Sequence, residues 1–109
     1  MPPETPPVPV LATYHVATSL LTVTFDQPLQ PGTSAIGNWR CWVGDPGTVY
    51  RKDNDTPATI AGSTVTATMP PGVVSTGPNR CRYFAAPADV LGLTGLPAAP
   101  WTSFPVTMI

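Results

Sequence analysis

The side chains best suited to covalent or acid–base chemistry are few and far apart in this chain. There is one histidine, His15, and there are two cysteines, Cys41 and Cys81. A catalytic histidine needs a nucleophile and an orienting acid, yet no Ser or Cys stands in a recognisable activating motif such as GxSxG. We therefore expect His15 to be an ordinary strand or interface residue, and we expect no enzyme activity and no cofactor.

Metal binding has equally little support in the sequence. Two cysteines without a CxxC pair and a single histidine make a poor zinc site. The acidic cluster at 53–55 follows Arg51 and Lys52, but a calcium loop needs more oxygen ligands at fixed spacing and a glycine. We interpret this cluster as a solvated loop tip and predict no metal site.

Two further carboxylates, Asp26 and Asp89, fall in loops between the expected strands. A glycosidase would place such a pair on opposite sides of a substrate cleft. A domain of this size leaves little room for a cleft, so we do not expect catalysis from this pair.

The tryptophans are candidates for binding rather than for catalysis. Trp42 lies opposite the expected core face of its strand, and Trp101 precedes the last strand in a segment bounded by prolines. Exposed tryptophans anchor protein interfaces, and they also stack on sugar rings in carbohydrate-binding sandwiches. The alternative is that both side chains cover the edge of the core.

Arginines alternate on the same two segments. Arg40 lies beside Trp42, and Arg80 and Arg82 alternate with Cys81 in RCRYFAA. If the two strands share a sheet, these side chains form one Arg/Trp patch, a composition that is enriched at protein interfaces. We take them, with Trp101, as interface candidates.

Composition narrows the classes of partner. Charged residues make up 10% of the 109 residues, against about a quarter in a typical soluble chain. A surface poor in charge costs less to desolvate and so suits burial in an assembly, but a small threonine-rich sandwich could have the same composition. Five cations in all give no basic stripe for nucleic acid. No apolar run approaches the roughly 20 residues of a membrane helix.

The elements that must position these residues are short strands. LLTVTF, STVTATM and SFPVTMI alternate apolar and polar residues with period two, and turn signals recur every 8–12 residues or so. The sequence predicts a hairpin turn at Gly62-Ser63. Sixteen prolines and nine glycines oppose long helices. The pattern predicts an all-β, immunoglobulin-like sandwich of about seven to eight strands over residues 10–109.

In such a sandwich the strands carrying Cys41 and Cys81 can be neighbours, with both sulfurs facing the core. A disulfide closing this loop would add roughly 3–4 kcal/mol of stability. In bacterial cytosol, buried free thiols are expected instead. The sequence leaves both states open.

Residues 1–9 hold five prolines and no periodicity, which predicts an extended arm. Either this arm is a solvated tail, or it docks on a neighbouring subunit through Pro2, Pro3, Pro6 and Pro7. We favour docking, because free proline-rich tails are seldom ordered.

Several short segments occur in an order that carries a family resemblance. They are TFDQPL at 24–29, Asn38-Trp39, AGSTVT at 61–66, Tyr83, Asp89 with Gly92, and Phe104. This set resembles bacterial Ig-like domains of the SbsA-like type, found in surface-layer and adhesin proteins. One departure is Gly92-Leu93, where the family usually has Gly-Asn. The resemblance implies a fold and a contact role, and no reaction.

The N-terminus lacks the charged and apolar regions of a signal peptide. By analogy, a small Ig-like chain of this kind is expected in a bacteriophage virion, assembled in the host cytoplasm. It would be a capsid decoration (cement) or tail-associated subunit, in contact with the major capsid or tail protein and with copies of itself. The alternative is an extracellular adhesion or carbohydrate-binding module of a bacterial cell surface, which would meet a host-surface glycan.

Overall fold

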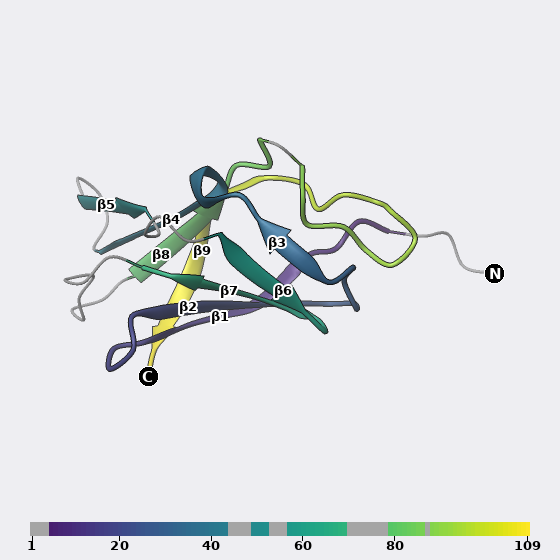
Figure 1. The fold of residues 1–109 in the computed structure, drawn as a ribbon. Helices are drawn as coiled ribbons and strands as arrows, with labels where there is room; N and C mark the ends of the chain where they lie inside the picture. Colours follow the sequence, from purple (N-terminus) through teal and green to yellow (C-terminus); the bar gives the residue numbers. More distant parts are fainter. Residues whose placement is uncertain (1–4, 44–48, 53–56, 70–78, 87) are drawn as a thin grey trace.

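The computed structural model describes residues 5–43, 49–52, 57–69, 79–86 and 88–109, and it confirms an all-β fold (Figure 1). Within these residues the only helical element is a 3-10 turn, η1, at Ile36–Asn38. No helix in this part of the chain is long and apolar enough to cross a membrane. The strands are β1 Pro9–His15, β2 Leu20–Phe25, β3 Gly32–Ser34, β4 Trp39–Val43, β5 Val49–Lys52, β6 Ala58–Ala61, β7 Thr64–Thr68, β8 Asn79–Tyr83 and β9 Trp101–Met108.

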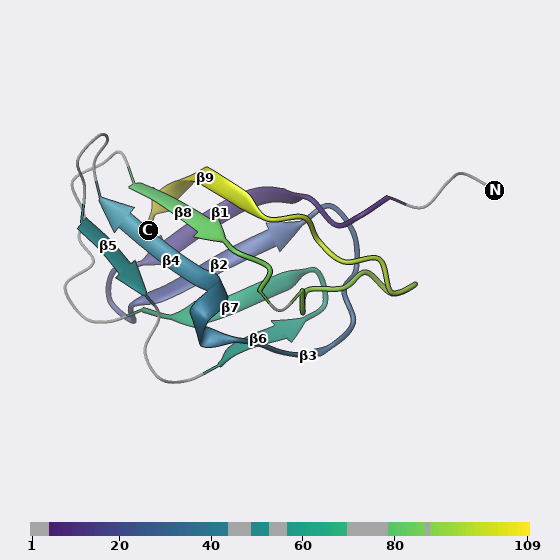
Figure 2. The same cartoon turned by 90° about the horizontal axis from the view of Figure 1, so that it is seen from above.

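The strands join into one curled mixed sheet in the order β3-β6-β7-β2-β1-β9-β8-β4-β5. Every pair is antiparallel except β1 and β9, which run parallel at Thr13–Thr107 and Tyr14–Met108. In Figure 1, β9 crosses from the level of β8 to the level of β1, and in Figure 2, which is a view from above, β4 and β8 lie in front of β1 and β2. We call β3-β6-β7-β2-β1 the first half of the sheet and β9-β8-β4-β5 the second half.

In the first half of the sheet, buried and partly exposed residues alternate along the strands, and the buried ones form one side of the core. Leu21, Val23 and Phe25 of β2 are buried, whereas the threonines between them are only partly covered. On β7, Val65 and Ala67 are buried opposite Val23 and Leu21. Burying each large apolar side chain contributes roughly 1.5–3 kcal/mol, so this register is strongly favoured over a slip by one residue. The period-two prediction is confirmed here.

The second half supplies the facing side chains. Trp39 and Cys41 of β4 lie opposite Tyr83 and Cys81 of β8, and all four are almost fully buried. Buried residues of both halves belong to a single core cluster. The rings of Phe25 on β2 and Trp101 on β9 come within 5.8 Å between centroids, which ties the two halves together.

The hairpin turn was predicted from the sequence, whereas one short strand was not. The hairpin at Gly62-Ser63 joins β6 to β7 as predicted, and Gly62 has a φ of 61°, a conformation that glycine adopts without steric cost. The short strand β3 is the addition to the expected strands. It pairs Gly32–Ser34 with β6, because the backbone after Pro31 can still form a brief ladder.

The described part of the N-terminal segment docks on its own chain. Val8 donates its N–H to Asp26 Oδ1 at 3.0 Å, and its carbonyl accepts the Asp26 N–H at 2.9 Å. The Thr5 carbonyl accepts from Gln27 Nε2 at 2.9 Å. Pro7 is buried and Pro6 is exposed. Pro2 and Pro3 lie outside the described residues, and Pro9 already belongs to β1.

Candidate functional site

A partly buried polar network surrounds Asp89, in the loop between β8 and β9. Its Oδ1 accepts hydrogen bonds from Ser34 Oγ at 2.7 Å and from the Tyr83 hydroxyl at 3.0 Å. Its Oδ2 accepts the N–H of Ala35 at 2.6 Å. The indole N–H of Trp39 donates to Ser34 Oγ at 2.7 Å. One carboxylate thus joins the end of β3 and the residue after it to the end of β8.

Tyr83 completes this network from the other side. Its hydroxyl accepts the backbone N–H groups of Asp89 and Val90, each at 3.2 Å. Burial raises the pKa of Tyr83 to about 12, although the two N–H donors act in the opposite direction. The hydroxyl therefore stays protonated and keeps donating to Asp89. The donors and acceptors of these groups are engaged in hydrogen bonds that hold the loop, so the network serves to position the loop.

Asn38 holds the segment that follows β8. Its backbone carbonyl accepts the N–H of Phe84 at 2.9 Å, and its side-chain Oδ1 accepts the N–H of Ala86 at 2.7 Å. Between these two anchors, Ala85 has a φ of 55°, in the left-handed region that costs a non-glycine residue about 1–2 kcal/mol. The buried Asn38 thus fixes the backbone on both sides of a strained residue.

Two loops meet at Gly92. Leu29 and Gly92 form a β-bridge, and Gln30 donates its N–H to the Leu91 carbonyl at 2.8 Å. A Cβ on Gly92 would lie 2.7 Å from Gln27 Oε1, so glycine permits the close approach of this side chain. The same Gln27 holds Thr5 in the N-terminal segment.

The outer surface of β4 and β8 carries the predicted arginines. Arg40 lies directly opposite Arg82, and Trp42 lies opposite Arg80 in the backbone register. The structure therefore brings these positions together on one sheet face, as the alternation predicted. The side chain of Trp42 lies outside the described part of the structure.

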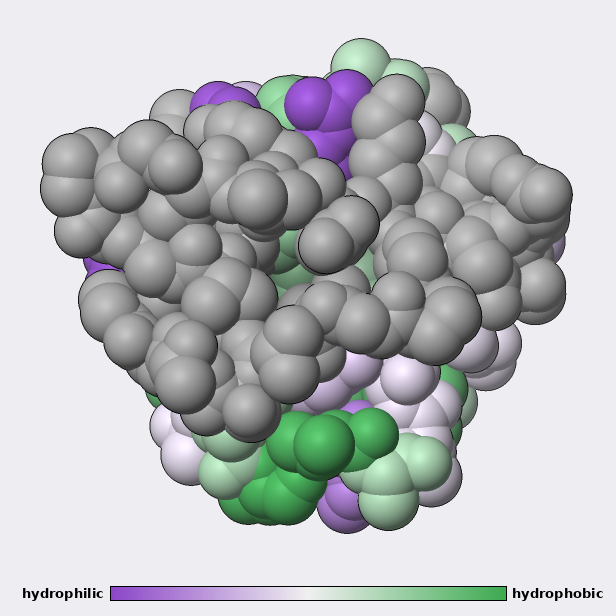
Figure 3. Space-filling view, turned by 90° about the vertical axis from the view of Figure 1, so that its left-hand side faces the viewer, coloured by the Kyte–Doolittle hydropathy of each residue, from purple (hydrophilic) through white to green (hydrophobic). Residues whose placement is uncertain are grey.

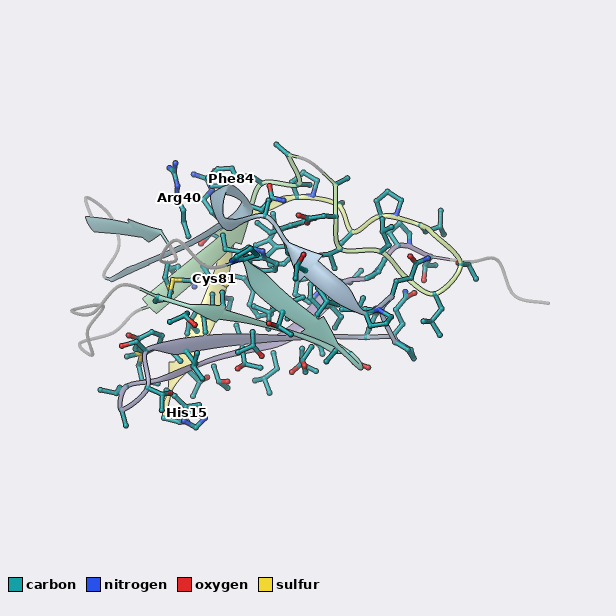
Figure 4. All side chains as sticks on the ribbon, viewed as in Figure 1. His15, Arg40, Cys81 and Phe84 are labelled. Atoms are coloured by element: carbon teal, nitrogen blue, oxygen red, sulfur yellow. The ribbon has the colours of Figure 1, made fainter. Side chains whose placement is uncertain are left out.

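Two of these arginines converge on Phe84, which the sequence analysis did not single out. The Arg40 Cζ atom lies 4.9 Å from the centre of the Phe84 ring, and the Arg82 Cζ atom lies 4.6 Å from it. Figure 4 shows Arg40 and Phe84 together on the upper side, with the nitrogens of Arg40 directed away from the sheet. We call Arg40, Arg82 and Phe84 the Arg–Phe face. The alternation of RCRYFAA already placed Phe84 with the arginines.

Arg80 is held differently from its neighbours on this surface. Its Nε donates to Ser103 Oγ on β9 at 2.7 Å. It contacts the next strand rather than the Phe84 ring, so it extends the basic surface without belonging to the Arg–Phe face.

Trp101 is partly buried and packs against the core, as expected of a side chain that covers the edge of the core. Its ring centroid is 5.2 Å from that of Tyr83, 5.8 Å from that of Trp39 and 6.4 Å from that of Phe104. The indole nitrogen is buried and makes no hydrogen bond of ordinary geometry within the described residues. A β-bulge where β8 pairs with β9 shifts the register and turns this ring inward.

The two cysteines are buried, directly opposed and unbridged. Burial raises the pKa of both thiols to about 12. For Cys81, the nearby Trp101 indole and the charge of Arg80 act in the other direction, but burial outweighs both. Protonated, inaccessible thiols are poor nucleophiles and poor metal ligands. Figure 4 shows Cys81 between the two halves of the sheet.

The remaining candidates do not come together. His15 ends β1 at an exposed position, on the opposite side of the molecule from Arg40 (Figure 4). Asp26 binds the N-terminal segment, whereas Asp89 is bound within its own network. The cluster at 53–55 lies outside the described residues. Among those described, no three His, Cys, Asp or Glu side chains group as a metal site.

The end of the molecule shown in Figure 3 carries both hydrophobic and hydrophilic areas. The largest hydrophobic area among the described atoms lies at the lower edge and the largest hydrophilic one at the upper edge. At the corner where the chain ends, exposed Val16 and Ile109 are joined by a backbone hydrogen bond of 3.0 Å.

Comparisons of the chain with protein-family models, with curated proteins and with solved structures found no match.

Proposed function

We propose that the curled sheet is an immunoglobulin-like sandwich that acts as a non-catalytic contact module. The strand order supports this proposal. The series β6-β7-β2-β1 has the order D-E-B-A, and β9-β8-β4-β5 has the order G-F-C-C′. Variable-type immunoglobulin domains divide their strands between two sheets in this way. The short β3 would be an extra strand beside D.

The buried network supports the resemblance to bacterial Ig-like domains. Asn38-Trp39, Tyr83 and Asp89 are distant in sequence but lie in linked hydrogen bonds at one end of the core. If the fold is common to this chain and those domains, the residues that match are expected to be the ones that hold such a junction together.

The proposed activity is binding of other proteins within a bacteriophage virion. The chain would serve as a capsid decoration (cement) or tail-associated subunit, with the major capsid or tail protein and its own copies as partners. The carrying observation is the surface of β4 and β8, where Arg40 and Arg82 approach the Phe84 ring and Arg80 lies on the same face. These are three of only five cations in the chain. Arginine and aromatic side chains are enriched in interface cores.

Copurification with particles tests this function. Phage particles that carry the gene are banded on a density gradient, and mass spectrometry then measures the copies of this chain in each particle band. The proposal predicts a fixed number of copies per particle. A chain that remains monomeric and stays out of the particle band contradicts it.

The alternative is an adhesion or carbohydrate-binding module of a bacterial surface protein. The family resemblance favours it, but Trp101 is partly buried and packs against Tyr83 at the edge of the core, which counts against a sugar-stacking role for this ring. A gene that encodes a long secreted chain would favour this alternative, whereas a short gene among head or tail genes would favour the virion subunit. A glycan array without hits would count against sugar binding.

A further inference from the structure

We propose that Cys41 and Cys81 are a bridging pair whose state is set where the chain folds. A chain that folds in an oxidising environment closes a disulfide between β4 and β8, and a chain that folds in a reducing one keeps both thiols in the same fold. The basis is the place of the two cysteines in the ladder, directly opposite each other. This inference concerns the sheet itself and does not depend on the proposed virion role.

The two cysteines occupy the kind of ladder position at which facing side chains come closest. In an antiparallel ladder, pairs that exchange backbone hydrogen bonds alternate with pairs that do not. The N–H of Phe84 donates to the Asn38 carbonyl at 2.9 Å, and these residues continue the register of β4 and β8. They are therefore a hydrogen-bonded pair. Cys41 and Cys81 lie three pairs further along, so alternation makes them a non-hydrogen-bonded pair.

The spacing of such a pair fits a disulfide with little movement of the backbone. Its Cα atoms are about 4.5 Å apart, within the range of about 4.4–6.8 Å that disulfides span. Its Cβ atoms approach to about 4.5 Å, at the upper end of the range found in bridges. Cys41 and Cys81 are both buried on the inner side of the sheet, so their sulfurs share one space. The pKa of Cys41 reflects this proximity, because Cys81 adds to the rise that burial causes.

Burial determines when the bridge can close. Thiol–disulfide exchange needs a thiolate that the oxidant can reach, and in the folded chain burial raises the pKa of both thiols to about 12. A small oxidant such as glutathione disulfide therefore reacts during folding, or when β4 separates from β8. A chain that has already folded with two thiols keeps them.

The closing reaction is two exchanges in sequence. The thiolate of one cysteine attacks glutathione disulfide, forms a mixed disulfide and releases one glutathione thiolate. The thiolate of the other cysteine attacks the mixed disulfide at the first cysteine's sulfur and releases the second glutathione thiolate. The chain loses two hydrogen atoms in all, and one glutathione disulfide becomes two glutathione thiols.

A closed bridge fastens the centre of the ladder between β4 and β8. The ladder holds five pairs, from Trp39–Tyr83 to Val43–Asn79, and the cysteines are the middle pair. The bridge closes a loop of about forty residues, which removes conformational entropy from the unfolded chain. We therefore expect the bridged form to be the more stable one. The fold should also shield the bridge from reductants, as it shields the thiols from oxidants.

Refolding the full chain under two redox conditions tests the inference. Reduced, urea-denatured protein is diluted into a mixture of reduced and oxidised glutathione, or into reduced glutathione alone. We expect the first product to be a monomer that is lighter by two hydrogen atoms, with Cys41 linked to Cys81 in a peptide map. Its melting temperature should be higher by about 10 °C or more. Amide NMR signals of β2 and β7 should coincide in the two products, with differences confined to β4, β8 and their neighbours.

The single variants Cys41→Ala and Cys81→Ala are matched controls. Each removes one buried thiol and leaves no partner for the other, so the oxidised buffer should give no rise in melting temperature. The peptide map of the wild-type product tests the bridge independently of how well these variants fold. Reduction of the bridged wild type by reduced glutathione should be slow without urea and should accelerate as urea unfolds the protein.

Three results would overturn the inference. The first is a natively folded wild-type product that still carries two thiols, or glutathione on its cysteines, after refolding in the oxidised buffer. The second is a bridged product that has lost the native amide signals of β2 and β7, which would mean that the bridge and the fold exclude each other. The third is a bridged product that melts no higher than the reduced one.

Discussion

The Tyr83 hydroxyl and Asp89 bind each other twice. The hydroxyl donates to Asp89 Oδ1 at 3.0 Å and accepts the backbone N–H of the same residue at 3.2 Å. This double contact fixes the loop after β8 to the end of the strand. Because Asp89 also holds Ser34 and Ala35, it sets the position of η1 and of the start of β4. The Arg–Phe face is built on these same two strand ends.

Tyr83→Phe should lower the free energy of unfolding by about 1–3 kcal/mol. The change leaves the N–H groups of Asp89 and Val90 without their acceptor, in a part-buried site. Urea denaturation measures the loss. Tyr14→Phe is the control, since no described residue is hydrogen-bonded to the hydroxyl of this buried tyrosine. Equal losses in the two variants would show that the Tyr83 hydrogen bonds contribute nothing specific.

Asp89→Asn should destabilise the fold by about 1–3 kcal/mol, although the shape of the side chain is kept. An amide has one acceptor oxygen, so its NH₂ group would face either the N–H of Ala35 or the hydroxyls of Ser34 and Tyr83. Asp26→Asn is the matched control, because its exposed Oδ1 can be replaced by the amide oxygen. Thermal and urea unfolding of both variants measure the two losses of stability. A larger loss of stability for Asp26→Asn than for Asp89→Asn would contradict the prediction.

Stability should fall as the pH rises from about 9 to about 12. The pKa of Cys41, Cys81 and Tyr83 is raised to about 12 in the folded state, from 9.0 for the thiols and 10.0 for the phenol. A raised folded-state pKa gives stability that is complete below the unfolded pKa and is lost as the pH rises through the folded value. Melting temperatures across this range measure the effect.

The double variant Cys41→Ala, Cys81→Ala separates the thiols from the tyrosine. It should show a shallower fall of melting temperature between about pH 9 and about pH 12, whatever its stability at neutral pH. A wild-type melting temperature that stays constant to about pH 11 would contradict the burial of these groups.

Cys41 and Cys81 should remain free and unreactive in the native protein. Both thiols are buried and protonated at neutral pH, so a thiol reagent should modify them only as the protein unfolds. Mass spectrometry without reductant should give the mass of two thiols, and both should react in denaturant. A mass lower by two hydrogen atoms would show a bridge between β4 and β8.

Alternation was enough to predict the inner faces of most strands. In β2 and β7, each apolar residue at every second position reaches the core, since a half-buried strand allows one register only. The same rule brought Cys41 and Cys81 inward and placed the arginines outside. The same rule places Phe84 on the outer side of the sheet, because Phe84 follows Arg82 by two residues.

The contacts that depend on loops were beyond such a rule. Trp101 turns inward at a bulge that breaks the alternation of β9, and no residue type marks that bulge in the sequence. Asp89 was placed in a loop, but its partners Ser34 and Ala35 lie more than fifty positions away. Only the closed sheet brings them together, so a sequence pattern cannot show which hydrogen bonds they make.

The most direct test of contact through β4 and β8 is a count of copies on gradient-purified particles, for wild type, Arg40→Gln and Arg80→Gln. If the Arg–Phe face is the binding surface, the particle band should retain wild type and Arg80→Gln and lose most of Arg40→Gln, with all three proteins equally folded. Equal retention of the three, or their shared absence from the band, would contradict it.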